Sequence, residues 1–301
     1  MKGKKLLKKQ ATLKLNSRIG KSYILISTMI STLIIMVILG VLLINSYDAI
    51  TEISWDLFTL KWNPSENQFG ILSMLYGSIT VTLIALIISI PLGILTAIYI
   101  SEILNERYRI YVKTVLELLA GIPSIIYGLI GVAFFSVWVG NFFNLQSGRT
   151  LFTAGFLLSV MILPTIITLV EDSLNNVPQK YRETAKGLGL YPYEVIIHSV
   201  LPIAKKDISG SILLALGRAF GETMAVMLLI GSIDKIPSPF YNLLAPAQTI
   251  TSKLGREISE SAFGSIHFSA LIFMGLILLI IVLILTSINH YYFRQEQQIY
   301  E

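Results

Sequence analysis

The chain has 301 residues, of which 54% are hydrophobic and 14% are charged, and its formal net charge is +5. A soluble globular domain carries about 25% charged residues, so this composition is typical of a protein surrounded mostly by lipid. Cysteine is absent, which excludes disulfides and thiolate metal ligands, and the three histidines lie too far apart in sequence to indicate a metal site.

Six apolar segments are each long enough to cross a bilayer, which needs about 20 residues in a helix. They are residues 22–47, 71–100, 114–137, 151–170, 208–232 and 267–291. The first is longer than the apolar part of a signal peptide, and no small-residue cleavage site follows it. The sequence therefore predicts an all-α polytopic membrane protein with six transmembrane helices.

Basic residues predict the orientation of these helices. Residues 1–21 hold eight Lys and Arg and no acidic residue, as expected of a cytoplasmic tail. With that tail inside, the inner segments carry 17 Lys and Arg and the outer segments carry five. We therefore expect both termini in the cytoplasm, with 292–301 as a C-terminal tail and 48–70 as an extracytoplasmic loop. Contact of the basic tail with anionic lipid is an additional expectation; binding to nucleic acid is the less favoured alternative.

Interior prolines distinguish three of the six segments. Pro91, Pro123 and Pro164 each remove a backbone donor, and in lipid the freed carbonyl needs a partner from a neighbouring helix or from water. We therefore expect the second, third and fourth segments to lie inside the bundle. The first and sixth segments are expected to face lipid.

A polar loop of about 37 residues, 171–207, is long for a connection between helices. Pro178 is suited to the start of a short helix that reaches Lys186, and Gly189 to its end. Pro192 can open a second short helix, and Pro202 is expected to interrupt the chain before the fifth segment. The sequence predicts a helix–turn–helix at the cytoplasmic surface.

The spacing in this loop resembles the cytoplasmic pattern of permease subunits of ABC importers: E-A-A, three residues, G, nine residues, I-x-L-P. Thr184 replaces the alanine at the second position of E-A-A, and Ser199 stands in place of isoleucine. In that family the element is a coupling helix that docks in a groove of the ATPase subunit. An amphipathic loop resting on lipid headgroups is the alternative interpretation. The positions that the resemblance assigns to ATPase coupling are Glu183, Thr184, Ala185, Gly189, Leu201 and Pro202.

Three further segments, 118–128, 161–164 and 217–225, look like the phosphate importer permeases. Of the two related types in that importer, PstC and PstA, Met224 after Gly221-Glu222-Thr223 and the stretch 62–71 resemble PstC. The resemblance implies four kinds of partner: a second, PstA-like permease, a PstB-like ATPase dimer, a PstS-like extracytoplasmic phosphate-binding protein, and lipid. It also implies a plasma (inner) membrane location in a bacterium or archaeon. ATP would bind the partner, and no cofactor is expected on this chain, which lacks a P-loop.

Arg218 lies about ten residues into the fifth segment, roughly 15 Å along a helix and so near the bilayer midplane. Arginine at that depth is costly and needs a partner or a water-filled path. Glu222, four residues later, is expected on the same helix face. We expect Arg218, Glu222 and Thr223 to line the translocation path, with Glu222 orienting the guanidinium. The alternative is an ion pair that only holds two permeases together.

Competing functions remain open at this point. The chain could serve another oxyanion, be the PstA type, be driven by an ion gradient, or be a membrane sensor or scaffold. We expect no enzymatic activity, because no catalytic motif stands out. Trp55, Trp62 and Tyr76 are expected to anchor the outer membrane interface. Glu117 is expected to reach the headgroups or to pair with a neighbouring cation.

Overall fold

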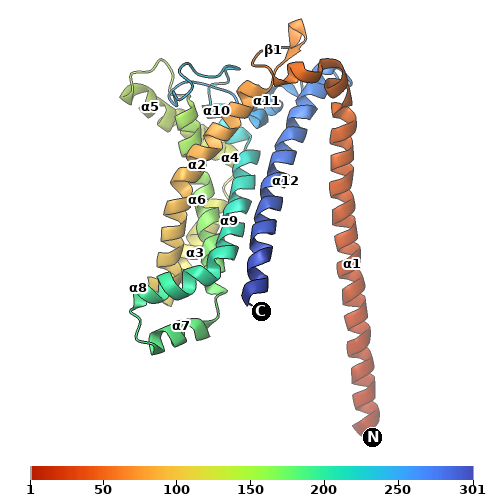
Figure 1. Ribbon diagram of the computed structural model, residues 1–301, viewed down its shortest axis with the longest axis vertical. Helices are drawn as coiled ribbons and strands as arrows, with labels where there is room; N and C mark the ends of the chain where they lie inside the picture. The colour runs from red at the N-terminus through yellow and green to blue at the C-terminus, as the bar shows by residue number, and fades with distance from the viewer. Residues whose placement is uncertain (1, 301) are drawn as a thin grey trace.

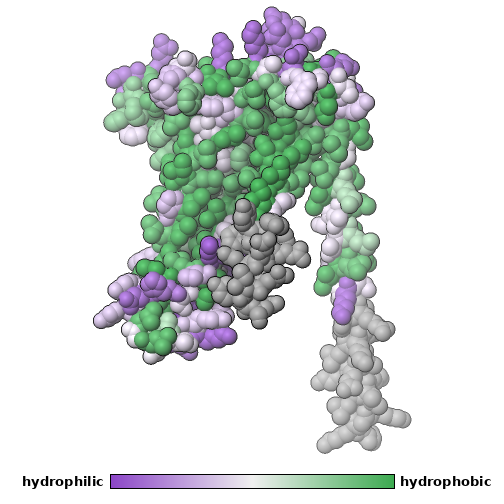
Figure 2. Space-filling model, in the orientation of Figure 1, coloured by the Kyte–Doolittle hydropathy of each residue, from purple (hydrophilic) through white to green (hydrophobic). Residues whose placement is uncertain are grey.

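The computed structural model describes the backbone of residues 2–300 and the side chains of residues 20–288. Within that part of the chain, five helical segments are long and apolar enough to cross a membrane: Gly20–Phe58, Leu72–Ile103, Ser124–Phe142, Leu151–Asn175 and Ile266–Ile288. Figure 2 shows a hydrophobic band between two hydrophilic ends. The prediction of a mostly helical membrane protein is therefore confirmed, whereas two of the six predicted spans take a different form.

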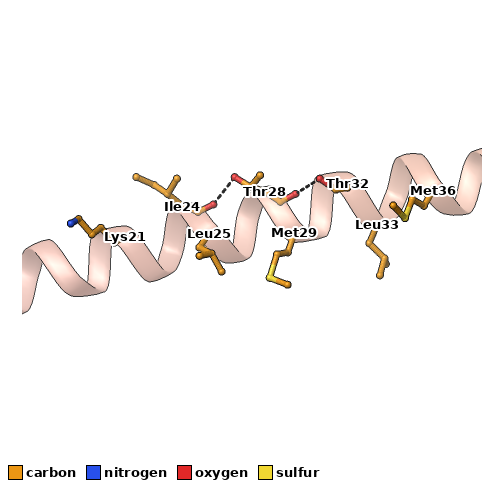
Figure 3. Close-up of a pocket in the computed structure, with 8 residues that line it drawn as sticks. All are labelled: Lys21, Ile24, Leu25, Thr28, Met29, Thr32, Leu33 and Met36. Carbon is orange, nitrogen blue, oxygen red and sulfur yellow. Dashed lines mark hydrogen bonds between the residues drawn. The ribbon is translucent and has the colours of Figure 1, made fainter. Parts of the chain in front are cut away.

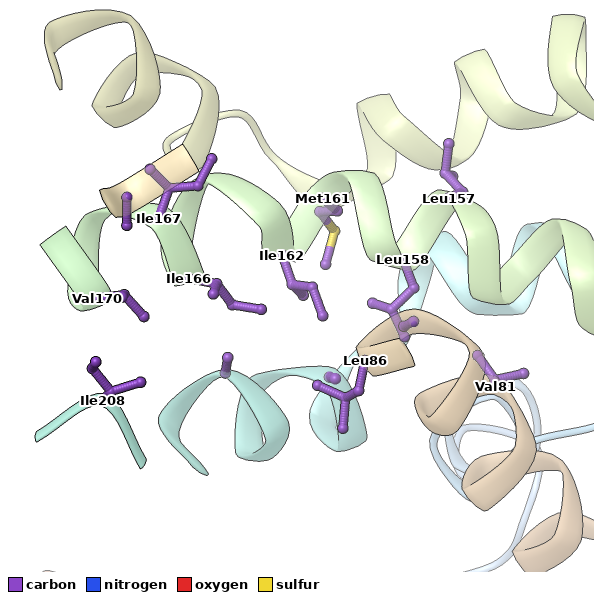
Figure 4. Packing of buried hydrophobic residues seen from close by; sticks show 14 of the residues in the cluster. Val81, Leu86, Leu157, Leu158, Met161, Ile162, Ile166, Ile167, Val170 and Ile208 are labelled. Carbon is purple, nitrogen blue, oxygen red and sulfur yellow. The ribbon is translucent and has the colours of Figure 1, made fainter. Parts of the chain in front are cut away.

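The centre of the bundle is the helix pair α2 (Leu72–Ile98) and α6 (Leu151–Asn175), with α2 extended by the π-helical turn η4 (Tyr99–Ile103). A glycine on each helix lets the two backbones approach closely. A Cβ placed on Gly93 would lie 2.5 Å from Cγ2 of Ile166, and one on Gly155 would lie 2.7 Å from Cβ of Ile84. Figure 4 shows the apolar side chains of α6 packed against those of α2 and α9.

The third predicted span, 114–137, is interrupted. Helix α3 (Glu106–Ala120) ends before Gly121, and α4 (Ser124–Ile130) begins after Pro123. The helix then continues through the π-helical turn η5 (Gly131–Phe135) into α5 (Ser136–Phe142). Proline and glycine explain the interruption. This segment is only 28% buried, the same as the sixth, so the expectation that it lies inside the bundle is wrong.

The polar loop after α6 forms α7 (Gln179–Gly187) and α8 (Pro192–Val195), as predicted. The prediction of an interruption at Pro202 is wrong. Helix α8 runs on through the π-helical turn η6 (Ile196–Val200) into α9 (Leu201–Gly221). Figure 1 shows this run bending between α8 and α9. The wider π-helical turn next to a proline explains the bend without a break.

The fifth predicted span, 208–232, consists of two helices. Helix α9 ends at Gly221, Glu222 is extended with a ψ of 125°, and α10 (Met224–Leu229) follows. The rest of the chain passes through α11 (Ile250–Glu257) to the long helix α12 (Ile266–Tyr300).

Helix α1 (Lys2–Asp48) stands apart from the bundle over most of its length, and its apolar stretch is unburied, as expected of a helix facing lipid (Figure 1). In Figure 3 the hydroxyls of Thr28 and Thr32 donate to the carbonyls of Ile24 and Thr28, so they expose no unpaired donor to the surroundings. Two short helical turns, η1 (Ala49–Ile53) and η2 (Ser54–Phe58), follow α1. A small antiparallel hairpin then pairs β1 (Trp62–Asn63) with β2 (Gln68–Phe69) around the turn η3 (Pro64–Glu66).

Two ends of the molecule can be defined from Figure 1. Helices α7 and α8 mark one, the α7 end, and α1 begins and α12 ends on that side. The β hairpin and α11 mark the other, the α11 end. Helix α1 thus begins, and α12 ends, on the same side as the loop 171–207; that this side faces the cytoplasm stays a prediction.

Candidate functional site

The candidate site lies where two interrupted helices meet between the two ends of the molecule. Helix α3 ends at Ala120, and α9 carries Arg218 in its last turn. The carbonyl groups of a helix C-terminus have no partner within the helix and carry a partial negative charge. A cation placed here is therefore stabilised without a carboxylate beside it.

Arg218 takes its partners from two other helices. Its Nη1 donates to the Thr165 hydroxyl on α6 at 2.7 Å, and its Nη2 donates to the Ala120 carbonyl at 3.4 Å. Tyr127 on α4 donates to the neighbouring Leu119 carbonyl at 3.0 Å. Arginine has five N–H donors, and two are used among the described residues, so the guanidinium can still bind another acceptor.

The predicted pairing of Glu222 with Arg218 on one helix face is wrong, because α9 ends before Glu222. The Glu222 carboxylate instead accepts the Ala225 amide at 3.1 Å and caps α10. Its carbonyl accepts the Thr251 hydroxyl from α11 at 2.7 Å. The Thr223 hydroxyl donates to the Gly221 carbonyl at 3.2 Å. These hydrogen bonds of Glu222 and Thr223 fix the backbone between α9 and α10. The role of the two residues in a translocation path stays a prediction.

Arg218 is exposed in the isolated chain although it lies in the middle of an apolar band. Leu214, one turn earlier on the same helix, is 66% exposed, and Met224 beyond the interruption is 44% exposed. A charged group with free donors on a face otherwise made of exposed apolar side chains requires either another chain or a watered path in front of it.

The residues assigned to ATPase coupling lie together at the α7 end. Ala185 is buried against the bundle, whereas Glu183, Thr184 and Leu188 point outward, with Leu188 76% exposed. Gly189 has a φ of +85°, and no atom of the described residues lies within 4 Å of a Cβ placed on it. Glycine is therefore needed there for the backbone conformation, not for space.

The turn after α7 explains that requirement. The Gly189 amide donates to the Lys186 carbonyl at 3.0 Å, and the Leu190 amide donates to the Ala185 carbonyl at 3.3 Å. This pair of hydrogen bonds is a Schellman motif, which needs a left-handed residue. Leu201 and Pro202 lie at the start of α9, with Leu201 partly buried against the main core.

The sequence did not predict a cluster of charged residues that lies near the α7 end. Glu171 at the end of α6 is 2% exposed. It accepts hydrogen bonds from Arg109 and Lys113 on α3, and from Asn175 one turn later at 2.6 Å. The hydrogen bond to Asp172, together with the hydrogen bond to Glu171 and the negative charges of both carboxylates, raises the pKa of Lys113 above its ordinary value. Arg109 and Lys113 thus pair with α6, a helix distant in sequence, and not with Glu117.

A second missed cluster lies at the α11 end. Lys253 is buried between Asp234 and Glu257, at 2.5 Å from a carboxylate oxygen of each. Glu257 also accepts Trp62 Nε1 at 3.0 Å and pairs with His267 Nε2 at 3.0 Å. Burial raises the pKa of the Glu257 carboxyl, but Lys253, His267 and Trp62 outweigh it, and the net pKa lies below the ordinary value.

Of the three aromatic residues expected as interface anchors, only Trp55 is largely exposed, at 81%. Trp62 is partly buried and forms part of the cluster just described. Tyr76 donates its hydroxyl to the Phe240 carbonyl. Trp62 and Tyr76 are drawn into the protein by hydrogen-bond partners that lie far away in the sequence. The expectation of membrane anchors rested on local sequence alone and could not include these partners.

A family model for the inner membrane component of binding-protein-dependent transport systems matches residues 89–296. The chain belongs to this family.

Relatives of this transport component span most of its length. It is 34% identical over 289 residues to the phosphate transport system permease protein PstC of Mesorhizobium japonicum, with 88% of this chain and 87% of the relative covered. It is 30% identical to the probable phosphate transport system permease protein PstC of Methanocaldococcus jannaschii, with 87% and 89% covered.

Solved structures show the same fold at lower identity. A chain of a bacterial alginate ABC transporter, in complex with an alginate-bound periplasmic protein, matches with a TM-score of 0.61 and 18% identity, covering 93% of this chain and 96% of that one. A chain of an inward-facing MetNI methionine ABC transporter matches with a TM-score of 0.55 and 17% identity, covering 75% and 94%. The transport component thus has an ABC importer permease fold.

Proposed function

We propose that this chain is the PstC-type permease subunit of an ATP-driven importer that moves inorganic phosphate into the cytoplasm. The relatives that cover most of the chain are named for phosphate transport. The observation that carries the proposal is Arg218, a guanidinium with free donors exposed between two interrupted helices. Its planar fork suits two phosphate oxygens, and its position about ten residues into the fifth predicted span puts it near the bilayer midplane.

The proposed topology has six crossings with both termini in the cytoplasm. The interrupted pair α9 and α10 supplies the fifth crossing, in addition to the five long apolar helical segments. The excess of Lys and Arg on the side of α7 makes that end cytoplasmic. The location is the plasma membrane of a bacterium or archaeon.

Three partners complete the proposed assembly. The outward face of α7, with Glu183 and Thr184, and Leu188 directly after that helix dock on a PstB-like ATPase dimer, which binds ATP. A PstA-like permease covers the apolar face around Arg218. A PstS-like binding protein delivers phosphate at the α11 end. ATP binding then moves α7 and switches the path between outward and inward access.

Reconstitution of the complete complex in proteoliposomes tests this function. We expect labelled phosphate to accumulate only when the binding protein and ATP are both present, and excess unlabelled sulfate to leave the rate unchanged. Strong competition by sulfate would assign the path to another oxyanion. Accumulation driven by an ion gradient without ATP would contradict the importer class altogether.

A further inference from the structure

The further inference concerns how α7 is attached to the membrane helices. Helix α7 has nine residues, and Ala185 is its one buried residue within the described side chains. So short a helix has little stability of its own and depends on its attachments. Its apolar attachment is small, so polar contacts decide how firmly it follows the bundle.

Arg182 supplies those contacts. It lies three residues before Ala185, on the same inward face, and its side chain is 11% exposed. Its Nη2 and Nε donate to the two carboxylate oxygens of Glu102 at 2.6 and 3.2 Å. Its Nη1 donates to the Val177 carbonyl at 2.6 Å, and its Nη2 also donates to the Leu174 carbonyl at 2.8 Å.

These acceptors belong to the ends of the two central helices. Glu102 lies in η4, the continuation of α2, and its side chain is 10% exposed. Leu174 lies in the last turn of α6, and Val177 follows that helix. One planar side chain therefore fastens α7 to α2 and α6 together, a geometry that the single ammonium group of lysine cannot reproduce.

The polar contacts continue from Glu102 to α3. The Ser101 hydroxyl lies 3.2 Å from Glu102 Oε1 and 3.1 Å from Asn175 Oδ1. Asn175 donates to Glu171 at 2.6 Å, and Glu171 accepts Arg109 of α3.

Helix α3 completes the route to the candidate site. It has no fully buried residue, and its ion pairs with α6 add to the packing of its partly buried Val112 and Leu116 against the main core. Its last carbonyl, that of Ala120, lies 3.4 Å from Arg218 Nη2.

We propose that Arg182 is the positioning residue that passes the movement of α7 to the membrane helices, through Glu102 and the Ser101–Asn175–Glu171–Arg109 contacts, to the end of α3 that meets Arg218. This inference rests on the proposed function. It assigns to Arg182 no contact with ATP, phosphate or the ATPase. Its effect is on coupling: the amount of phosphate moved for each ATP hydrolysed.

The test uses the complete complex in proteoliposomes and measures phosphate uptake and ATP hydrolysis in the same vesicles. For Arg182→Gln and Glu102→Gln we expect the ATPase to copurify as in the wild type and hydrolysis to continue. The phosphate moved per ATP should fall about tenfold, which lies within the range of factors by which two coupled sites usually affect each other. In the double variant, the phosphate moved per ATP should fall little further than in either single variant, because each single change removes the same contact between Arg182 and Glu102.

Arg107→Gln is the matched control. Arg107 is an exposed arginine two residues from Arg109 on α3, and its side chain lies outside the chain of contacts traced above. It should retain the wild-type ratio of phosphate to ATP. Arg109→Gln, within the contacts, should lower the ratio.

Three outcomes separate the possibilities. A wild-type complex that takes up no phosphate with ATP contradicts the proposed function itself. A wild-type complex that transports, together with Arg182→Gln at an unchanged ratio, overturns the inference alone. Loss of assembly in both Arg182→Gln and the milder Arg182→Lys would make Arg182 a folding residue and would also overturn it.

Discussion

At the scale of single residues, Arg218 shows how a charge is accommodated in an apolar band without a carboxylate. Its position near the C-termini of α3 and α9 provides one carbonyl partner, that of Ala120, and a favourable helix dipole. The hydroxyl of Thr165 provides a second, neutral partner at 2.7 Å. A guanidinium neutralised by a close carboxylate would attract a phosphate less strongly, so this arrangement favours an anion over an internal ion pair.

The backbone conformation of Gly189 leads to a prediction about the coupling element. Alanine at its φ of +85° should cost about 1–2 kcal/mol and distort the turn after α7. We expect Gly189→Ala to reduce copurification of the ATPase while the permease stays folded, as measured by pull-down and size-exclusion chromatography.

Gly187→Ala is the control for that change. Gly187 lies within α7, and in the part of the chain that the structure describes no atom is within 4 Å of a Cβ placed on it. Alanine there should be neutral or stabilise the helix by about 1 kcal/mol. Equal behaviour of the two variants would contradict the structural requirement for glycine at position 189.

The pairing of Glu257 leads to a prediction about how the stability of the protein depends on pH. Its pKa in the folded protein lies below the ordinary value of 4.5, so its pairing stabilises the fold above that pH. This stabilisation is lost as the pH falls through the lowered folded pKa. We expect Glu257→Gln to lower the melting temperature in detergent at pH 7, and the gap from the wild type to shrink as the pH falls below 4.5. A gap that widens on acidification would contradict the assigned charge state.

At the scale of helices, the close approach of α2 and α6 depends on small residues. Gly93→Ala would bring a methyl group within 2.5 Å of Ile166, a branched side chain inside the core. Such overpacking costs about 1–3 kcal/mol, so we expect a lower melting temperature. Gly210→Ala in α9, where the described residues place no atom within 4 Å of the added Cβ, should not destabilise the protein. Destabilisation of both variants alike would show that glycine at position 93 has no special packing role.

Local signals in the sequence predicted much of this helical architecture. Apolar length located the membrane segments, and Pro178, Gly189 and Pro192 set the limits of α7 and α8 within a residue or two. The interruption before α4 also has a local cause in Gly121 and Pro123, although the sequence led us to expect one continuous span over 114–137.

The features that the sequence did not predict depend on contacts between distant segments. The interruption at Glu222 is supported by the Thr251 hydroxyl, 29 residues away. Arg109 finds its carboxylate partner 62 residues away, in Glu171. Spacing along one helix cannot identify such partners, and this is why the expected pair of Arg218 with Glu222 failed.

At the scale of the whole molecule, the proposed topology places the α7 end in the cytoplasm and the α11 end outside. The chain contains no cysteine, so single introduced cysteines report unambiguously. Phe263 at the α11 end is 83% exposed and Tyr193 in α8 is 61% exposed. We expect an impermeant maleimide to label Phe263→Cys in intact spheroplasts and Tyr193→Cys only after lysis. The reverse pattern would invert the topology.

The most direct measurement is phosphate uptake by the complete complex in proteoliposomes, comparing the wild type with Arg218→Gln in parallel. Glutamine keeps two N–H donors but removes the charge and the planar fork. We expect ATP-dependent accumulation by the wild type, and its loss in a variant that still assembles with the ATPase and the second permease. Uptake at the wild-type rate by an assembled Arg218→Gln complex would contradict the role of Arg218 in the phosphate path.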